Sequence, residues 1–259
     1  MTFIKSIKTE LKNITLKEYD PPAPELLITD QECISIAFLD TETTGVNKTS
    51  DKIIELALKV VTFEKASGNI VSIDIEYESF NDPGEEISQE ITMLTGISDE
   101  MVEGQSIDWE RVDAILKDAE IVVAHNAGFD RAFVDRYSSV SPNKIWACSM
   151  QDIDWLGRGF SSFKQELLCY WHGFYFDAHR AMNDVDALIN LLTHPSYEVD
   201  RPLLELIKNS QKPTYVIFAT NFNYDPVKKD IVKANKYKWN AEDRVWYKTV
   251  SFDDLDKEK

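Results

Sequence analysis

Two acidic residues stand close together at the end of the first strongly apolar run of the sequence. Residues 34–39 predict a buried strand, and Asp40 and Glu42 follow at its end. In an extended chain these two side chains project to the same side, about 7 Å apart along the chain. Their charges repel unless a cation lies between them, so the pair indicates a metal site. A surface acidic edge is the alternative, but it does not explain the preceding apolar run.

A third carboxylate, Asp130, follows a second apolar run at residues 121–124, where the chain enters a predicted helix. A carboxylate in the first turn of a helix can also serve the helix N-terminus electrostatically, so both roles stay open from this segment. We predict that Asn126 supports the site without touching a metal. His125 is expected to be a structural histidine.

The third segment with reactive side chains contains His179 and Asp184. Five residues of helix turn through about 500°, so the two do not share a face if both are helical, and we place His179 in a mobile loop before the helix. Asp184 aligns with Leu188 and Leu191 on the buried face, where a carboxylate needs a partner or a metal. Asp186 lies off this stripe and is expected to be solvated.

The elements that must position these residues follow from hydrophobic periodicity. Three strands at 34–39, 53–63 and 70–80 predict an antiparallel meander. Further strands are expected at 120–124 and 145–148, with helices at 88–94, 109–116, 162–171 and 181–192 and one beginning near Phe129. A meander followed by alternating strands and helices predicts an α/β domain, with a mixed five-stranded sheet flanked by helices.

The chain is expected to contain two unequal domains. Residues 1–31 form an arm, with helical character at 3–16 and an extended Pro21–Pro24 segment, and residues 32–197 form the main domain. Residues 198–212 are a predicted linker, 213–250 a small α+β domain and 251–259 a charged tail. Within the small domain we expect a strand at 215–219, a helix at 227–235 and a hairpin at 237–248. The small domain has 7 basic and 4 acidic residues, a balance of 7 − 4 = +3, so the rest of the chain carries −17 − 3 = −20.

Composition limits the possible partners. The 28 basic and 45 acidic residues give a net charge of −17, which on average repels a phosphate backbone. A carboxylate cluster that binds divalent cations is neutralised locally, so the charge does not exclude nucleic acid. No apolar run approaches the roughly 18 residues that span a bilayer, and the first residues alternate too closely for a secretory signal. We expect a cytoplasmic protein with no membrane partner.

Taken in order, the three acidic segments resemble the motifs of the DEDDh 3′–5′ exonuclease superfamily, named after its four acids and histidine. The likeness is greatest to the epsilon (proofreading) subunit of bacterial DNA polymerase III and its stand-alone relatives. The segment from Asp82 to Val102 also resembles the stretch between the first two motifs of that group. The resemblance covers residues 33–192, and it implies a ribonuclease H-like fold.

The resemblance also implies the chemistry. Two Mg²⁺ or Mn²⁺ ions would be held by Asp40, Glu42, Asp130 and Asp184, with His179 deprotonating the attacking water. The leaving group would be the 3′ oxygen, so the products would be nucleoside 5′-monophosphates. By analogy, substrate contacts are expected from Thr41, Thr43, Phe129, Leu94 and Ile97.

Other functions remain open from the sequence. The catalytic motifs contact the scissile phosphate, so the enzyme would act on DNA 3′ ends or, as an RNA-trimming enzyme, on RNA 3′ ends. A binding subunit that docks on a DNA polymerase or clamp is the rival of another class. The small C-terminal domain interleaves basic and aromatic residues, as at Lys238 and Trp239, which is typical both of a nucleic-acid-gripping module and of a small core.

Overall fold

The computed structural model describes residues 16–19, 29–220, 226–235, 237–241, 243–251, 255–256 and 258. Residues 3–15 of the predicted N-terminal helix and the Pro21–Pro24 segment lie outside these residues, whereas Leu16, its predicted last residue, is described and is not helical. The chain divides into two compact units, residues 1–210 and 211–259. In the described part of the chain, no helix is both long and apolar enough to cross a membrane.

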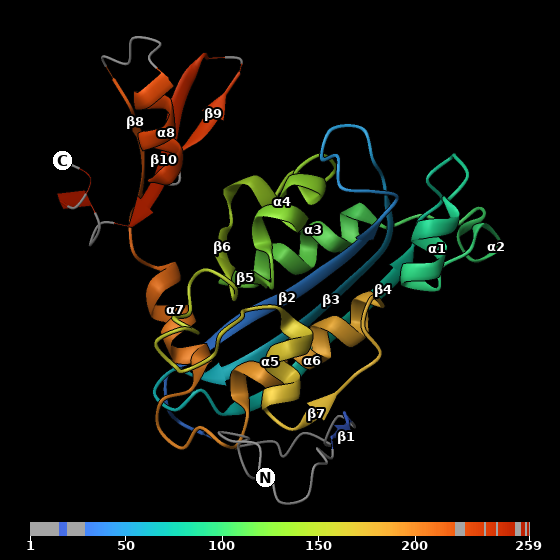
Figure 1. Cartoon of the computed structure of the whole chain (residues 1–259). Helices are drawn as coiled ribbons and strands as arrows, with labels where there is room; N and C mark the ends of the chain where they lie inside the picture. The colour runs from blue at the N-terminus through green and yellow to red at the C-terminus, as the bar shows by residue number, and fades with distance from the viewer. Residues whose placement is uncertain are drawn as a thin grey trace, which may run out of the picture. The chain divides into compact units, whose positions relative to one another are not determined.

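A mixed five-stranded sheet in the order β4-β3-β2-β5-β6 forms the centre of the first unit (Figure 1). Its strands are β2 (Cys33–Thr43), β3 (Ile53–Glu64), β4 (Ile70–Phe80), β5 (Ile121–Ala124) and β6 (Ile145–Cys148). The first three pair antiparallel and the last two add in parallel, so the predicted meander and ribonuclease H-like sheet are confirmed. β2 runs three residues beyond its predicted end at Asp40, because its pairing with β3 continues to Thr43.

Successive side chains of β2 enter two different cores. Ile36 and Phe38 pack with α5 (Gln165–Trp171) and α6 (Ala181–Thr193), while Ala37 and Leu39 pack with α3 (Trp109–Asp118) and α4 (Ala127–Val134). Figure 1 shows these two pairs of helices on opposite sides of the long β2 and β3 strands. Even-numbered residues of β2 therefore face α6, and odd-numbered residues face α4.

Part of the predicted linker belongs to the first unit. Pro202 begins helix α7 (Pro202–Ser210), and Leu203 and Leu206 are fully buried in the same core as α6. The prediction of a linker at 198–212 was therefore wrong for residues 202–210. It gave weight to the polar stretch 209–212 and overlooked the helical spacing of the apolar residues before it. The remaining elements of the first unit are short: β1 (Lys17–Glu18), α1 (Gln89–Thr95), α2 (Asp99–Val102), η1 (Ser141–Asn143) and β7 (Phe174–Tyr175).

The second unit is a three-stranded antiparallel sheet with one helix. The strands are β8 (Thr214–Phe218), β9 (Lys238–Asn240) and β10 (Val245–Ser251) in the order β8-β10-β9, and α8 (Pro226–Ala234) connects β8 to β9. This is the strand, helix and hairpin order that the sequence predicts for residues 213–250. It forms a small α+β unit.

Candidate active site

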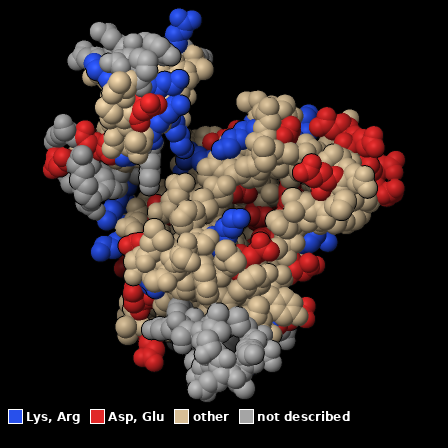
Figure 2. All heavy atoms as spheres, in the orientation of Figure 1, with Lys and Arg blue, Asp and Glu red and all other residues tan. Residues whose placement is uncertain are grey.

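Three carboxylates converge on the α6 side of the sheet. Oxygen atoms of Asp40, Glu42 and Asp184 lie within 4.8 Å of one another. The first two occupy alternate positions of β2, and the third lies in the first turn of α6, which packs across that face. Figure 2 shows acidic side chains in a hollow near the middle of this unit. Clustered carboxylate oxygens are the ligands that Mg²⁺ and Mn²⁺ prefer, so the donor set fits a divalent cation.

The electrostatics of these carboxylates are those of a buried cluster of like charges. Burial raises the pKa of Asp40 well above its usual range, and the charges of neighbouring carboxylates raise it further. Burial, followed by repulsion from Asp184, raises the pKa of Glu42 to about 8. The pKa of Asp184 rises to about 7, mainly through burial. A bound cation would reverse this trend, because it favours the ionised form of every carboxylate around it.

Asp130 of α4 lies beside the three carboxylates, and after burial its charge is the largest cause that raises the pKa of Asp40. Its side chain is buried, and its Oδ1 accepts hydrogen bonds from the Thr41 backbone N–H (3.1 Å) and the Thr41 hydroxyl (2.9 Å). Burial raises the pKa of Asp130 to about 6, while the hydrogen bonds from Thr41 act in the opposite direction. The sequence predicts that Thr41 faces the substrate. In the structure its amide and hydroxyl hold Asp130, because odd-numbered residues of β2 face α4, and contact of Thr41 with substrate stays a prediction.

His179 lies two residues before the first residue of α6, outside the helix as the spacing predicts. Its backbone N–H donates to Asp184 Oδ2 (2.8 Å), and its φ of 67° lies in the left-handed region. This conformation costs a residue other than glycine about 1–3 kcal/mol, so neighbouring contacts must hold it in place. The imidazole forms no hydrogen bond to the part of the chain that the structure describes, which leaves the ring available to water or substrate.

The contact that holds this loop comes from a residue that sequence reasoning missed. Glu55 of β3 lies opposite Glu42 in the strand register and is fully buried. Its carboxylate accepts hydrogen bonds from Arg180 Nη2 (2.9 Å) and from the backbone N–H of Ala181 (2.9 Å). Glu55 thus fixes the residue after His179 and the first residue of α6. A charged residue inside an otherwise apolar strand was the signal that identifies it.

A second ion pair ties α6 to the same strand. Lys59 is nearly buried, and its Nζ lies 2.5 Å from Asp186 Oδ1 and 2.9 Å from Glu76 Oε1. The prediction that Asp186 is solvated was therefore wrong. Its partner Lys59 lies four residues after Glu55, on the same face of β3. The apolar stripe of α6 was the basis of the prediction, and it does not reveal that a lysine of β3 lies beside Asp186.

The predicted apolar contacts to substrate divide into two groups. Ile97 is fully buried with Ile54, Ile87 and Val102, so it cannot offer a surface to a base, and that prediction was wrong. Leu94 is 51% exposed and remains a candidate. Phe129 is partly buried against Phe133, with ring centroids 4.9 Å apart, and also remains a candidate.

The polar candidates around the site also differ in their surroundings. The Thr43 hydroxyl is buried and donates to Gly45 O (2.7 Å), so only its backbone remains a candidate for contact with substrate. Asn126 is exposed at the N-terminus of α4, and its side chain forms no capping hydrogen bond. His125 bridges Ser149 Oγ and Phe163 O (2.8 Å each). Burial lowers the pKa of His125 to about 4, so it is the neutral structural histidine predicted.

Comparison with known proteins places this geometry in a family. Residues 37–192 match the family model of the exonucleases (RNase_T). The PolC-type DNA polymerase III of Listeria innocua is 38% identical over 102 residues, which are 37% of this chain and 6% of that protein. Its counterpart in Halalkalibacterium halodurans is 41% identical over 100 residues, with the same two shares. The chain thus spans only a small fraction of the length of these relatives.

Solved structures share the fold of the first unit at low sequence identity. E. coli exonuclease I in complex with a dT13 oligonucleotide has a TM-score of 0.51 at 16% identity, covering 64% of this chain and 41% of that chain. A 3′-exonuclease that recognises the 3′ end of the histone mRNA stem-loop has a TM-score of 0.51 at 14% identity, covering 65% of each chain. Since the family model spans more than half of the sequence, this chain belongs to the exonuclease (RNase_T) family.

Proposed function

We propose that the protein removes nucleotides one at a time from single-stranded or frayed 3′ ends of DNA and releases nucleoside 5′-monophosphates. The observation that carries this proposal is the convergence of Asp40, Glu42 and Asp184 within 4.8 Å, beside the loop that presents His179. Membership in the exonuclease family supports the direction of degradation. The predicted cytoplasmic location is part of the same proposal.

Two divalent ions, Mg²⁺ or Mn²⁺, are the proposed cofactors. Asp40, Glu42 and Asp184 would hold them directly, and Asp130 would contribute through water, because its Oδ1 is occupied by Thr41. Bound ions would stabilise negative charge on the phosphodiester and make water more acidic. The raised pKa values of these carboxyls support the proposal, since buried carboxylates without a counter-charge are costly.

His179 is the proposed general base. A histidine suits this role because its ordinary pKa lies near neutral pH. Its backbone is held on two sides, by Asp184 through its own N–H and by Glu55 through the next two residues. A ring with a fixed backbone and no hydrogen bond to a described residue can accept the proton of the attacking water. The 3′ oxygen would then leave the scissile phosphate.

DNA is the preferred substrate in this proposal because the polymerase relatives are the most similar sequences described above. Their identity of 38–41% extends over about 100 residues of this chain, and their name states that they are DNA polymerases. RNA is the second candidate, since a structural neighbour recognises a histone mRNA stem-loop. The same polymerase relatives favour a third possibility, a subunit that associates with a polymerase or clamp.

The test is the degradation of 5′-labelled single-stranded DNA and RNA of the same sequence with Mg²⁺ or Mn²⁺. We expect a ladder that shortens from the 3′ end, faster on DNA, together with released 5′-mononucleotides. EDTA and Asp40→Asn should abolish it, whereas Glu110→Gln, which removes an exposed carboxylate from the first turn of α3, should not. Faster loss of RNA would reverse the substrate assignment. Absence of cleavage of both polymers would favour the polymerase-associated binding subunit.

A further inference from the structure

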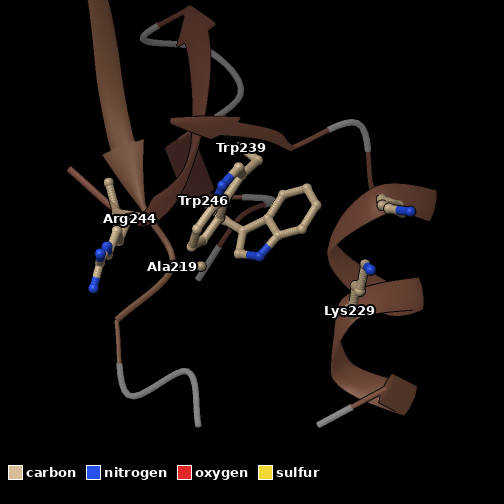
Figure 3. A pocket seen from close by; sticks show the side chains of 7 residues that line it. Ala219, Lys229, Trp239, Arg244 and Trp246 are labelled. Carbon is tan, nitrogen blue, oxygen red and sulfur yellow. The ribbon is translucent and has the colours of Figure 1, made fainter. Parts of the chain in front are cut away.

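A cavity of about 580 Å³ lies in the C-terminal unit and is lined from its sheet and from helix α8 (Figure 3). The seven described residues that line it are of two kinds, apolar and basic, and none of these seven is acidic. The cavity belongs to this unit alone, so it is separate from the carboxylate cluster of the first unit.

Two tryptophans form the apolar part of the cavity. Trp239 of β9 and Trp246 of β10 are direct partners in the hairpin, with ring centroids 5.5 Å apart and planes inclined by 55°. Trp246 is 8% exposed, as a core residue of a small domain would be, but Trp239 is 48% exposed. A need for core volume explains Trp246. It does not explain why Trp239 presents half of a large flat surface to water.

Three cations line the same cavity as the two rings. Lys229 and Lys233 are one turn apart on α8 and therefore share a face, and Figure 3 shows Lys229 on the helix that lies beside the indoles. Arg244 lies in the hairpin turn with a φ of 51°. Among the residues that the structure describes, no carboxylate pairs with any of the three. Their charge is therefore available to an anion.

We propose that this cavity binds one nucleotide unit of a single strand. The base would stack on Trp239, and the adjacent phosphates would lie against Lys229, Lys233 and Arg244. A flat apolar ring beside uncompensated cations matches the two parts of a nucleotide, since every base has an aromatic face and every linkage carries a negative charge. An acidic peptide would satisfy the cations but would leave the face of Trp239 unused.

The charge distribution along the chain supports the same ligand. Residues 213–250 carry +3 within a protein of −17, and Figure 2 shows basic side chains on the C-terminal unit. A local excess of cations on an otherwise acidic protein concentrates attraction for phosphate at this unit. One part of the proposal rests on the proposed exonuclease function: the choice of a nucleic-acid strand, and not a free nucleotide, as the ligand.

The experiment measures binding without hydrolysis. Full-length protein in EDTA is titrated into a fluorescein-labelled 20-nucleotide oligothymidylate, and Kd is read from fluorescence anisotropy over a range of salt concentrations. We expect Trp239→Ala to weaken binding about tenfold, because loss of one stacked base has an effect of this order. Trp239→Phe should retain most of the affinity. The double variant Lys229→Gln/Lys233→Gln should also reduce the slope of log K against log salt by about 1.4.

Matched variants separate the cavity from general effects. Phe218→Ala removes a 53% exposed aromatic ring of β8 outside the cavity, and Lys228→Gln/Lys238→Gln removes two exposed lysines outside it. Both should bind the oligonucleotide more tightly than the cavity variants do. Equal losses in cavity and control variants, or no loss with Trp239→Ala, would overturn the proposal. Competition by dTMP as strong per nucleotide as by the oligonucleotide would assign the cavity to free nucleotides and overturn the strand assignment.

Discussion

Glu42→Gln is expected to stabilise the metal-free protein while destroying its metal site. Burial and neighbouring carboxylates raise the pKa of Glu42 from 4.5 to about 8, and each unit corresponds to about 1.4 kcal/mol. At pH 8, where half of the folded protein still holds this proton, the shift would cost the folded state about 4 kcal/mol relative to the unfolded chain. Solvent and the other carboxyls relax around the site, so we expect the neutral glutamine to stabilise by about 1 to 4 kcal/mol.

The same shift sets the sign of the pH dependence. Between pH 4.5 and about 8, folded Glu42 keeps a proton that the unfolded chain has lost, so its contribution to stability is present below pH 4.5 and is lost as pH rises through 8. Asp184, whose pKa is raised to about 7, acts in the same direction. The free energy of unfolding of Glu42→Gln should therefore decline less steeply with pH than that of the wild type.

The assay is urea unfolding followed by circular dichroism at pH 5 and pH 8, in EDTA and in excess Mg²⁺. Mg²⁺ at about 100 times its Kd should stabilise the wild type by about 2.7 kcal/mol at pH 8, and it should stabilise Glu42→Gln much less. Glu110→Gln serves as the control, because Glu110 is exposed and is not one of the clustered carboxylates. A metal-free Glu42→Gln protein that is less stable than the wild type at pH 8 would refute the repulsion argument.

Three further variants test the residues that hold the site. Glu55→Gln should weaken the contacts to Arg180 and to the first turn of α6, destabilise the protein by about 2 kcal/mol in urea unfolding and lower kcat. Thr41→Val removes one hydrogen bond to Asp130, so it should cost about 1 kcal/mol and weaken Mg²⁺ binding measured by calorimetry, with Thr41→Ser restoring both. His179→Ala should lower kcat by about 10²- to 10⁴-fold in a mononucleotide-release assay, while Mg²⁺ still raises the melting temperature.

Each of these predictions has an outcome that contradicts it. Wild-type kcat in Glu55→Gln would mean that the loop before α6 does not depend on this ion pair. Unchanged Mg²⁺ affinity in Thr41→Val would separate Asp130 from the metal site. A His179→Ala protein that keeps full activity would assign the role of base to another group.

Much of the site could be predicted from local pattern. Strand alternation places Asp40 and Glu42 on one side of β2, and the helical stripe of Leu188 and Leu191 places Asp184 on the face of α6 that packs on the sheet. The strand, helix and hairpin order of the C-terminal unit was also predictable. These features depend on periodicities of two and 3.6 residues, which are properties of the chain itself.

Tertiary structure alone decided which side chains pair and which surfaces remain exposed. Glu55 and Arg180 are 125 residues apart in sequence, so no local pattern identifies one as the partner of the other. Thr41 supports Asp130 because these two residues, 89 apart in sequence, come together when β2 and α4 pack. Ile97 has an apolar side chain of the kind that could contact a base, but neighbouring elements bury it. Pairing and burial depend on contacts between distant segments, and those contacts exist only after the sheet and helices have packed.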